Sequence, residues 1–272
     1  MKTTLYGRTH APAAAIVGVW DPFLPRHEQL CASLAASARE RSLASLAIVL
    51  HPNPPALING DRLFPVYEDV HARAWRLRAH GIDAVLLLRM TRADADRGAA
   101  AFFDAILAAV PLAELWLGLA QSLGRGPAGA SATIAELAAS HGVRLRALPP
   151  PPSEGRGAAY EAIKLLGEGR LAEAIGRVGH PPVWRRPRSG VLALPWRPGR
   201  YRALPLASPG AAPDGPALTL SLRARKAKTP ALAWPDRRTR YLAFVEAAVE
   251  APDVPATRED ARAIPAASGT AG

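Results

Sequence analysis

The residues of this chain that are best suited to chemistry lie in a loop of ten residues, from Gly18 to His27. The loop also carries Asp21 and Arg26, and it connects the apolar run 14–17 to an amphipathic segment. This pattern predicts a buried strand, a loop and the start of a helix. At such a junction, free backbone N–H groups and the helix dipole favour an anion. We therefore expect this loop to bind a phosphate group.

Two further groups of polar residues follow apolar runs in the same way. Asn53 comes shortly after the run 43–50, and a glycine-containing loop with Gly118, Gly124 and Arg125 follows a later run. The carboxyl ends of parallel strands meet at one edge of a sheet. We therefore expect these residues and the first loop to surround one crevice, with His51 and Asn53 near a base or ribose and the Arg125 guanidinium near a phosphate.

Each assignment has a structural alternative. His27 is as well placed to cap a helix as to contact a phosphate, and Asp21 could cap its own loop instead of holding Mg²⁺. The remaining histidines show no metal-ligand spacing. The single cysteine, Cys31, excludes an intrachain disulfide, and its place on the apolar side of a helical pattern indicates a core residue.

The elements that must position these residues alternate regularly along the first half of the chain. Apolar runs typical of buried strands alternate with segments of helical periodicity. The runs cover residues 14–17, 43–50, 83–88, 114–118 and 143–148. This alternation requires right-handed crossovers and a mostly parallel sheet. We therefore predict an α/β, Rossmann-like domain over residues 1–148.

The second half of the sequence has a different pattern of apolar and turn-forming residues. Prolines and a flexible stretch begin the segment 149–182, where two short helices are expected to complete the first domain. Short segments separated by Pro, Gly and Asp then predict a small β-rich domain over residues 183–250. Residues 251–272 are poor in large apolar side chains, and we expect a disordered tail there.

Charge and hydropathy limit the class of protein. The chain has 272 residues, 49% of them hydrophobic, and a net charge of +11. The segment 183–250 carries 13 Lys or Arg against 4 Asp or Glu, which suits an anionic partner. It lacks the basic–aromatic repeat that binds single strands, so we do not expect nucleic acid to be the main partner. No apolar stretch of about 20 residues is present and no signal-peptide pattern is evident, so we expect a cytoplasmic protein without a membrane span.

The order of these motifs resembles the bacterial bifunctional riboflavin kinase/FAD synthetase family. The first loop of that family has the pattern G-x-F-D-G-V-H-x-G-H. Gly18, Asp21 and His27 match it, whereas Leu24 and Arg26 stand where the family has its first histidine and a glycine.

Later motifs extend the resemblance over about residues 14–182. The segment 50–54 keeps both prolines of the family's F-D-P-H-P, and Gly118 and Gly124 keep the glycines of its G-x-D-F-x-F-G. The segment 183–250 resembles a reduced riboflavin kinase barrel. It lacks the kinase motif G-F-P-T-A-N, so kinase activity is not expected.

The resemblance implies an FMN adenylyltransferase, which moves AMP from ATP to FMN and releases pyrophosphate, with Mg²⁺. It implies His27 as the catalytic residue, and nucleotide contacts from Gly18, Asp21, Arg26, Asn53, Gly118, Gly124 and Arg125. Two alternatives remain open. Leu24 and Arg26 favour a non-catalytic relative that binds a nucleotide or flavin, and the basic segment 183–250 favours a protein that binds an anion or nucleic acid.

Overall fold

The computed structural model describes residues 1–9, 11–54, 57, 66–118, 123, 131–148, 157–194, 196–225 and 228–248. The first half contains β1 (Lys2–Gly7), β2 (Ala13–Gly18), α1 (Pro25–Glu40), β3 (Ala44–His51), α3 (Val70–Ala79), β4 (Ala84–Arg89), α4 (Arg92–Asp96), α5 (Gly98–Leu107), β5 (Leu112–Gly118), α6 (Ser131–Ser140) and β6 (Arg144–Leu148). The second half contains α7 (Ala158–Gly167), α8 (Leu171–Val178), β7 (Val183–Arg185), β8 (Val191–Ala193), β9 (Gly199–Leu206), β10 (Leu218–Arg225), β11 (Lys228–Ala233) and β12 (Tyr241–Ala248). The expected linker 149–156 and tail 251–272 lie outside the described residues.

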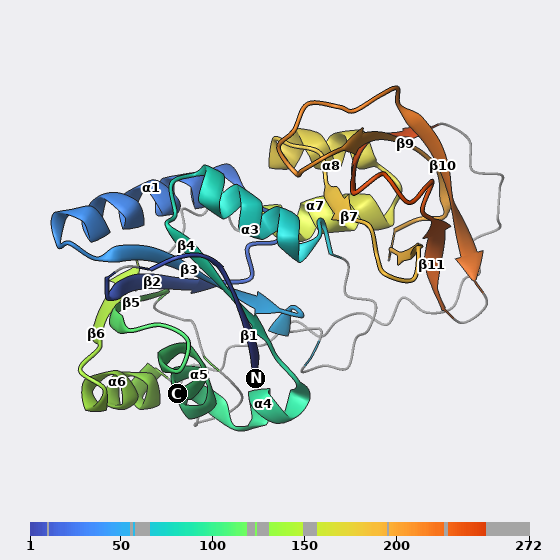
Figure 1. Ribbon diagram of the computed structural model, residues 1–272. Helices are drawn as coiled ribbons and strands as arrows, with labels where there is room; N and C mark the ends of the chain where they lie inside the picture. The colour runs from blue at the N-terminus through green and yellow to red at the C-terminus, as the bar shows by residue number, and fades with distance from the viewer. Residues whose placement is uncertain are drawn as a thin grey trace.

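The first half is built on a six-stranded sheet in the order β1-β4-β3-β2-β5-β6 (Figure 1). Strands β2 to β6 are parallel, which confirms the predicted α/β fold. The chain order reverses between β2 and β5, because β3 and β4 lie on one side of β2 while β5 and β6 lie on the other. Ligands of open α/β sheets bind beyond the carboxyl ends of the strands at such a switch point. Gly18 and Gly118 end these two strands.

Both faces of this sheet are covered, which explains the continuous apolar runs of its strands. Helices α1 and α3 cover one face, and α5 and α6 cover the other (Figure 1). Successive side chains of β2 enter opposite cores, Ala13, Ala15 and Val17 toward α5 and α6, and Ala14 and Ile16 toward α1 and α3. Cys31 of α1 is fully buried in the second of these cores, as the sequence indicated.

The second half confirms the predicted β-rich part, with a six-stranded antiparallel sheet in the order β7-β12-β9-β10-β11-β8. Its core is aromatic, with the ring of Trp196 at 5.2 Å from Phe244 and 5.8 Å from Tyr201 between centroids. The buried faces of α7 and α8 lie in this same core, and so do Leu24 and Tyr67 from the first half. The helix pair therefore shares its core with the second sheet, and the domain limits proposed from the sequence stay a prediction.

Strand β1 was not expected from the sequence, and the structure gives the reason. It pairs antiparallel with β4 at the edge of the sheet, from Lys2 opposite Arg89 to Gly7 opposite Ala84. Most of its side chains are exposed or half-buried, so it has no buried apolar run to reveal it. Among the described residues, no helix combines the length and the apolar character needed to cross a membrane.

The segment 66–69, just before α3, holds the two halves together. The Asp69 N–H donates to the Val183 carbonyl at 3.0 Å, and the Tyr67 hydroxyl donates to the His180 carbonyl at 2.5 Å. The Trp184 indole donates in return to the Tyr67 carbonyl at 3.2 Å. Because these bonds run in both directions between the halves, the contact is a specific interface.

Replacing Tyr67 by Phe should lower the free energy of unfolding by about 1–2 kcal/mol, because it leaves the partly buried His180 carbonyl without its donor. Tyr67 is fully buried, whereas Tyr160 is 60% exposed and offers a matched control. Urea unfolding followed by tryptophan fluorescence measures both variants. A Tyr67→Phe variant as stable as Tyr160→Phe would show that the hydroxyl bond does not stabilise the interface.

Candidate functional site

The loop between β2 and α1 folds back onto its own sheet. Trp20, Phe23 and Leu24 are all buried, and Leu24 is only 3% exposed. Trp20 adopts a left-handed backbone conformation with φ of 58°, and its indole N–H donates to the Ile48 carbonyl at 3.1 Å. The indole lies so close to Gly18 that a Cβ added there would be 3.0 Å from the ring. Gly18 is therefore needed for this close approach of Trp20.

His27 is held inside this loop as a neutral imidazole. Its Nδ1 accepts the Leu24 N–H at 3.0 Å, and its ring packs edge-on against Trp20, with centroids 5.2 Å apart. Burial, together with the positive charge of Arg26, lowers the pKa of His27 to about 3. Because Nδ1 accepts, the proton of the neutral ring belongs on Nε2.

The backbone donors at the start of α1 are largely occupied. The Leu24 N–H goes to the His27 ring, Pro25 has no N–H, and the His27 N–H donates to the Leu24 carbonyl at 2.7 Å. An anion at a helix N-terminus depends on such groups being free. Arg26 is half-buried, and burial lowers its pKa.

Asp21 is buried, and its carboxylate accepts the backbone N–H groups of Tyr67 at 3.1 and 3.2 Å and of Glu68 at 3.2 Å. Burial raises the pKa of Asp21 to about 6, although the nearby Arg73 opposes the shift. The carboxylate thus has a structural role, but it binds the segment before α3 and does not cap its own loop. Within the described ranges, no group of three or more His, Cys, Asp or Glu is placed to hold a metal ion. A Mg²⁺ contact from Asp21 stays a prediction.

The other expected site residues are only partly placed. Gly18 and Gly118 end the two strands at the switch point, and Asn53 follows β3 at the same edge of the sheet. The structure thus brings these three near one edge with the first loop. Gly124 and Arg125 lie outside the described residues. Contacts from all five residues to a ligand stay predictions.

A cleft lies between the two halves, beyond the carboxyl ends of β3 and β4, and its basic lining was not predicted from the sequence. Its volume is about 400 Å³. We call it the arginine cleft, because five arginines line it, namely Arg73, Arg89, Arg185, Arg186 and Arg188. The signal in the sequence was the basic run 184–188, directly after the segment that follows α8. Arg73 and Arg89 are far from that run in the chain, so only the fold could add them.

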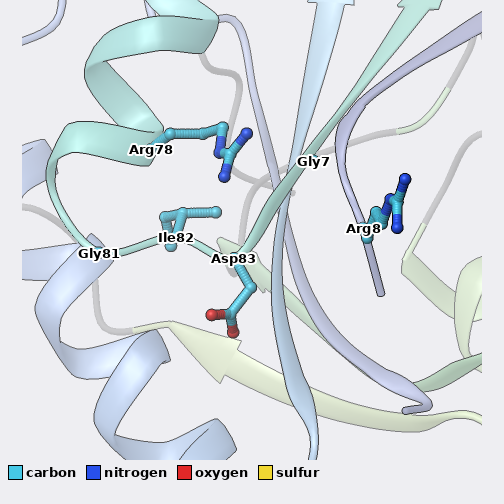
Figure 2. Close-up of a pocket in the computed structure, with 6 residues that line it drawn as sticks. All are labelled: Gly7, Arg8, Arg78, Gly81, Ile82 and Asp83. Carbon is cyan, nitrogen blue, oxygen red and sulfur yellow. The ribbon is translucent and has the colours of Figure 1, made fainter. Parts of the chain in front are cut away.

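A second cleft, of about 680 Å³, lies at the opposite edge of the first sheet. Figure 2 shows residues that line it, among them Arg78, Asp83 and Gly7 at the end of β1. Gly7 has a φ of 88°, and a Cβ there would be 2.6 Å from the Asp83 carbonyl oxygen. The Asp83 carboxylate accepts the Ser45 N–H and hydroxyl, at 2.8 and 2.7 Å. Because this edge holds the amino ends of the parallel strands, the cleft is not the expected crevice.

Comparison with known proteins places this architecture. The chain matches the FAD synthetase family over residues 8–157, which is more than half of its 272 residues. Among solved structures, it is similar to the crystal structure of a macrolide-efflux protein from Streptococcus pneumoniae, with a TM-score of 0.59 and 14% sequence identity. That match covers 90% of this chain and 88% of the other, and at this identity it shows the fold alone. No curated protein matches the chain.

The neutral state of His27 predicts a specific pH dependence. Its folded pKa of about 3 lies below the value of 6.5 expected when the chain unfolds, so its contribution to stability is present above pH 6.5 and is lost as the pH falls. Between pH 7 and pH 5 the wild type should lose about 2 kcal/mol more than His27→Asn, whose amide oxygen replaces the Nδ1 acceptor. Urea unfolding at both pH values measures the difference.

The exposed His141 provides the control for this experiment. His141→Asn should keep the wild-type dependence on pH. If His27→Asn keeps it as well, His27 is not held neutral by burial, and a charged contact to phosphate regains support.

Proposed function

We propose that this chain, which belongs to the FAD synthetase family, binds an adenine or flavin nucleotide without transferring AMP from ATP to FMN. The family implies ATP and FMN as the ligands. The main support for the absence of AMP transfer is the closed loop between β2 and α1. In this loop Leu24 is buried and the His27 ring accepts a backbone N–H.

Transfer of AMP requires this loop to supply groups that bind and align phosphates. An oxygen of the FMN phosphate would attack the α-phosphate of ATP, and pyrophosphate would leave. All these groups are anionic, so catalysis depends on hydrogen-bond donors and cations aligned along the phosphates. Loss of one such donor from a preorganised site lowers the rate by roughly 10²–10³.

This loop offers few of those donors. Leu24 stands at the position of the family's first histidine, and its side chain lies in the core of the second half. His27, at the position of the second histidine, is neutral and engaged through Nδ1. Arg26 adds bulk where the family has a glycine. These three features together support the loss of transfer.

Ligand binding is supported by the parts of the family frame that remain. The switch point is kept, with a glycine at the end of each of its strands, Gly18 and Gly118. Gly18, Asp21 and His27 keep their spacing, which favours residual AMP transfer as the second candidate. The two candidates differ in turnover, and both predict binding of ATP or FMN.

An assay with ATP, FMN and Mg²⁺ separates them. We expect binding of ATP or FMN in calorimetric titrations, and no FAD or pyrophosphate by chromatography even at high enzyme concentration. FAD formation above the enzyme-free blank would overturn the proposal in favour of AMP transfer. Absence of binding by both ligands would overturn both candidates.

The double substitution Leu24→His and Arg26→Gly restores the first histidine and the following glycine of the family's loop pattern, and it tests the position of residue 24. We expect no FAD formation and a free energy of unfolding lower by about 2 kcal/mol or more, because a polar ring replaces a buried apolar side chain. Leu5→His is the control, since Leu5 is exposed on β1, and it should change stability little. Gain of FAD formation by the double variant would show that residue 24 faces the nucleotide.

A further inference from the structure

The geometry points to the arginine cleft as a binding site for a phosphate group, most favourably a pyrophosphate or the terminal phosphates of a nucleotide. The cleft lies between the carboxyl edge of the first sheet and β7, which packs beside α3. Arg73 comes from α3, Arg89 ends β4 and Arg185 ends β7. An anion bound here would therefore contact both halves of the chain.

The charges of the cleft arginines are only partly neutralised by the described acids around them. Among the residues that the structure describes, none of the five forms an ion pair. The buried Nε atoms of Arg73 and Arg186 have no hydrogen-bond partner in this part of the chain. Arg73 is only 2% exposed, and one of its terminal nitrogens donates to the Val19 carbonyl at 2.8 Å.

This concentration of positive charge is electrostatically unfavourable. A guanidinium does not lose its proton at any relevant pH. A buried charge that is only partly neutralised is costly, and like charges that share a cleft repel one another. A bound anion would relieve both effects, so the cleft gains more from an anion than an ordinary basic surface does.

The two acids that line the cleft are already engaged. Glu68 is buried and forms an ion pair with Arg76 at 3.0 Å. Asp69 caps α3 by accepting the His71 N–H at 2.8 Å. Asp21 lies near Arg73, but its carboxylate holds backbone N–H groups, and burial raises the pKa of both Asp21 and Glu68. These acids therefore neutralise the arginines only in part.

The neighbouring histidine reports the same positive environment. Burial, together with the positive charges of Arg73, Arg89 and His71, lowers the pKa of His51 to about 4. The imidazole of His51 is thus neutral and available for hydrogen bonding in the cleft wall.

The shape of the cleft suits entry of a phosphate. Arg89, Arg185 and Arg188 are exposed at the rim, whereas Arg73 is buried. Planar guanidinium groups bind phosphate oxygens through pairs of parallel hydrogen bonds. Trp184 also lines the cleft, and its indole bond to the Tyr67 carbonyl fixes that wall. An anion can thus meet exposed arginines first and the buried one last.

This inference extends the proposed function, because it assigns a binding site to the phosphates of the ligand. It rests on the proposed function only for the identity of the adenine or flavin part of that ligand. Pyrophosphate alone is the probe. Calorimetric titration of the full chain should show one pyrophosphate bound per chain, with affinity that falls as NaCl rises. The double variant Arg89→Gln and Arg185→Gln should bind at least tenfold more weakly, and both sites are exposed, so the fold should be kept.

The control is Arg144→Gln with Arg200→Gln, which removes the same charge from exposed arginines outside the cleft. It should bind pyrophosphate as the wild type does. Equal weakening in both double variants, or none in either, would overturn the cleft as the site. As a second measurement, pyrophosphate should raise the Tm of the wild type and of the control, and raise that of the cleft variant much less.

Titrations with ATP and FMN distinguish failure of this inference from failure of the proposed function. If either nucleotide binds the wild type and the cleft variant equally well, the proposed function stands and the arginine cleft is not its phosphate site. If pyrophosphate binds while both nucleotides fail to bind, the cleft is an anion site and the proposed function falls. If none of the three binds, both fall.

Discussion

The buried carboxylate of Asp21 is the contact on which the arrangement of this protein depends. It comes from the loop after β2 and accepts two consecutive backbone N–H groups, those of Tyr67 and Glu68. Those residues belong to the segment that bonds to Val183 and His180 in the second half. A single acid thus fixes the first loop, the start of α3 and the contact between the halves, because each of them relies on the same short stretch of backbone.

With that stretch fixed, apolar side chains complete the loop. Trp20 closes over Gly18, and Leu24 enters the core of the second half. A leucine side chain cannot donate a hydrogen bond to a phosphate, but its burial is favoured by the hydrophobic effect. The loop that offers donors to a nucleotide in the family pattern therefore serves packing here, while basic side chains gather in the arginine cleft between the two halves.

Local sequence patterns predicted most of the first half, because its central strands β2 to β5 are buried on both faces and its helices are amphipathic. Sequence patterns did not predict strands that lack a run of buried apolar residues. Examples are the exposed edge strand β1 and the three-residue strand β7. The candidate site was harder still. The capping role of Asp21 depends on backbone groups 46 residues away, and the cleft joins Arg89 to Arg185 across the fold. Neither contact leaves a local signal in the sequence.

The burial of Leu24 also bears on how this chain can change over evolutionary time. A module that folds alone can be lost, exchanged or fused to another without harm to its neighbour. Here Leu24 and Tyr67 of the first half lie inside the core of the second, together with α7 and α8. Removing the second half would leave those side chains in water, so packing in each half constrains which substitutions the other half can accept.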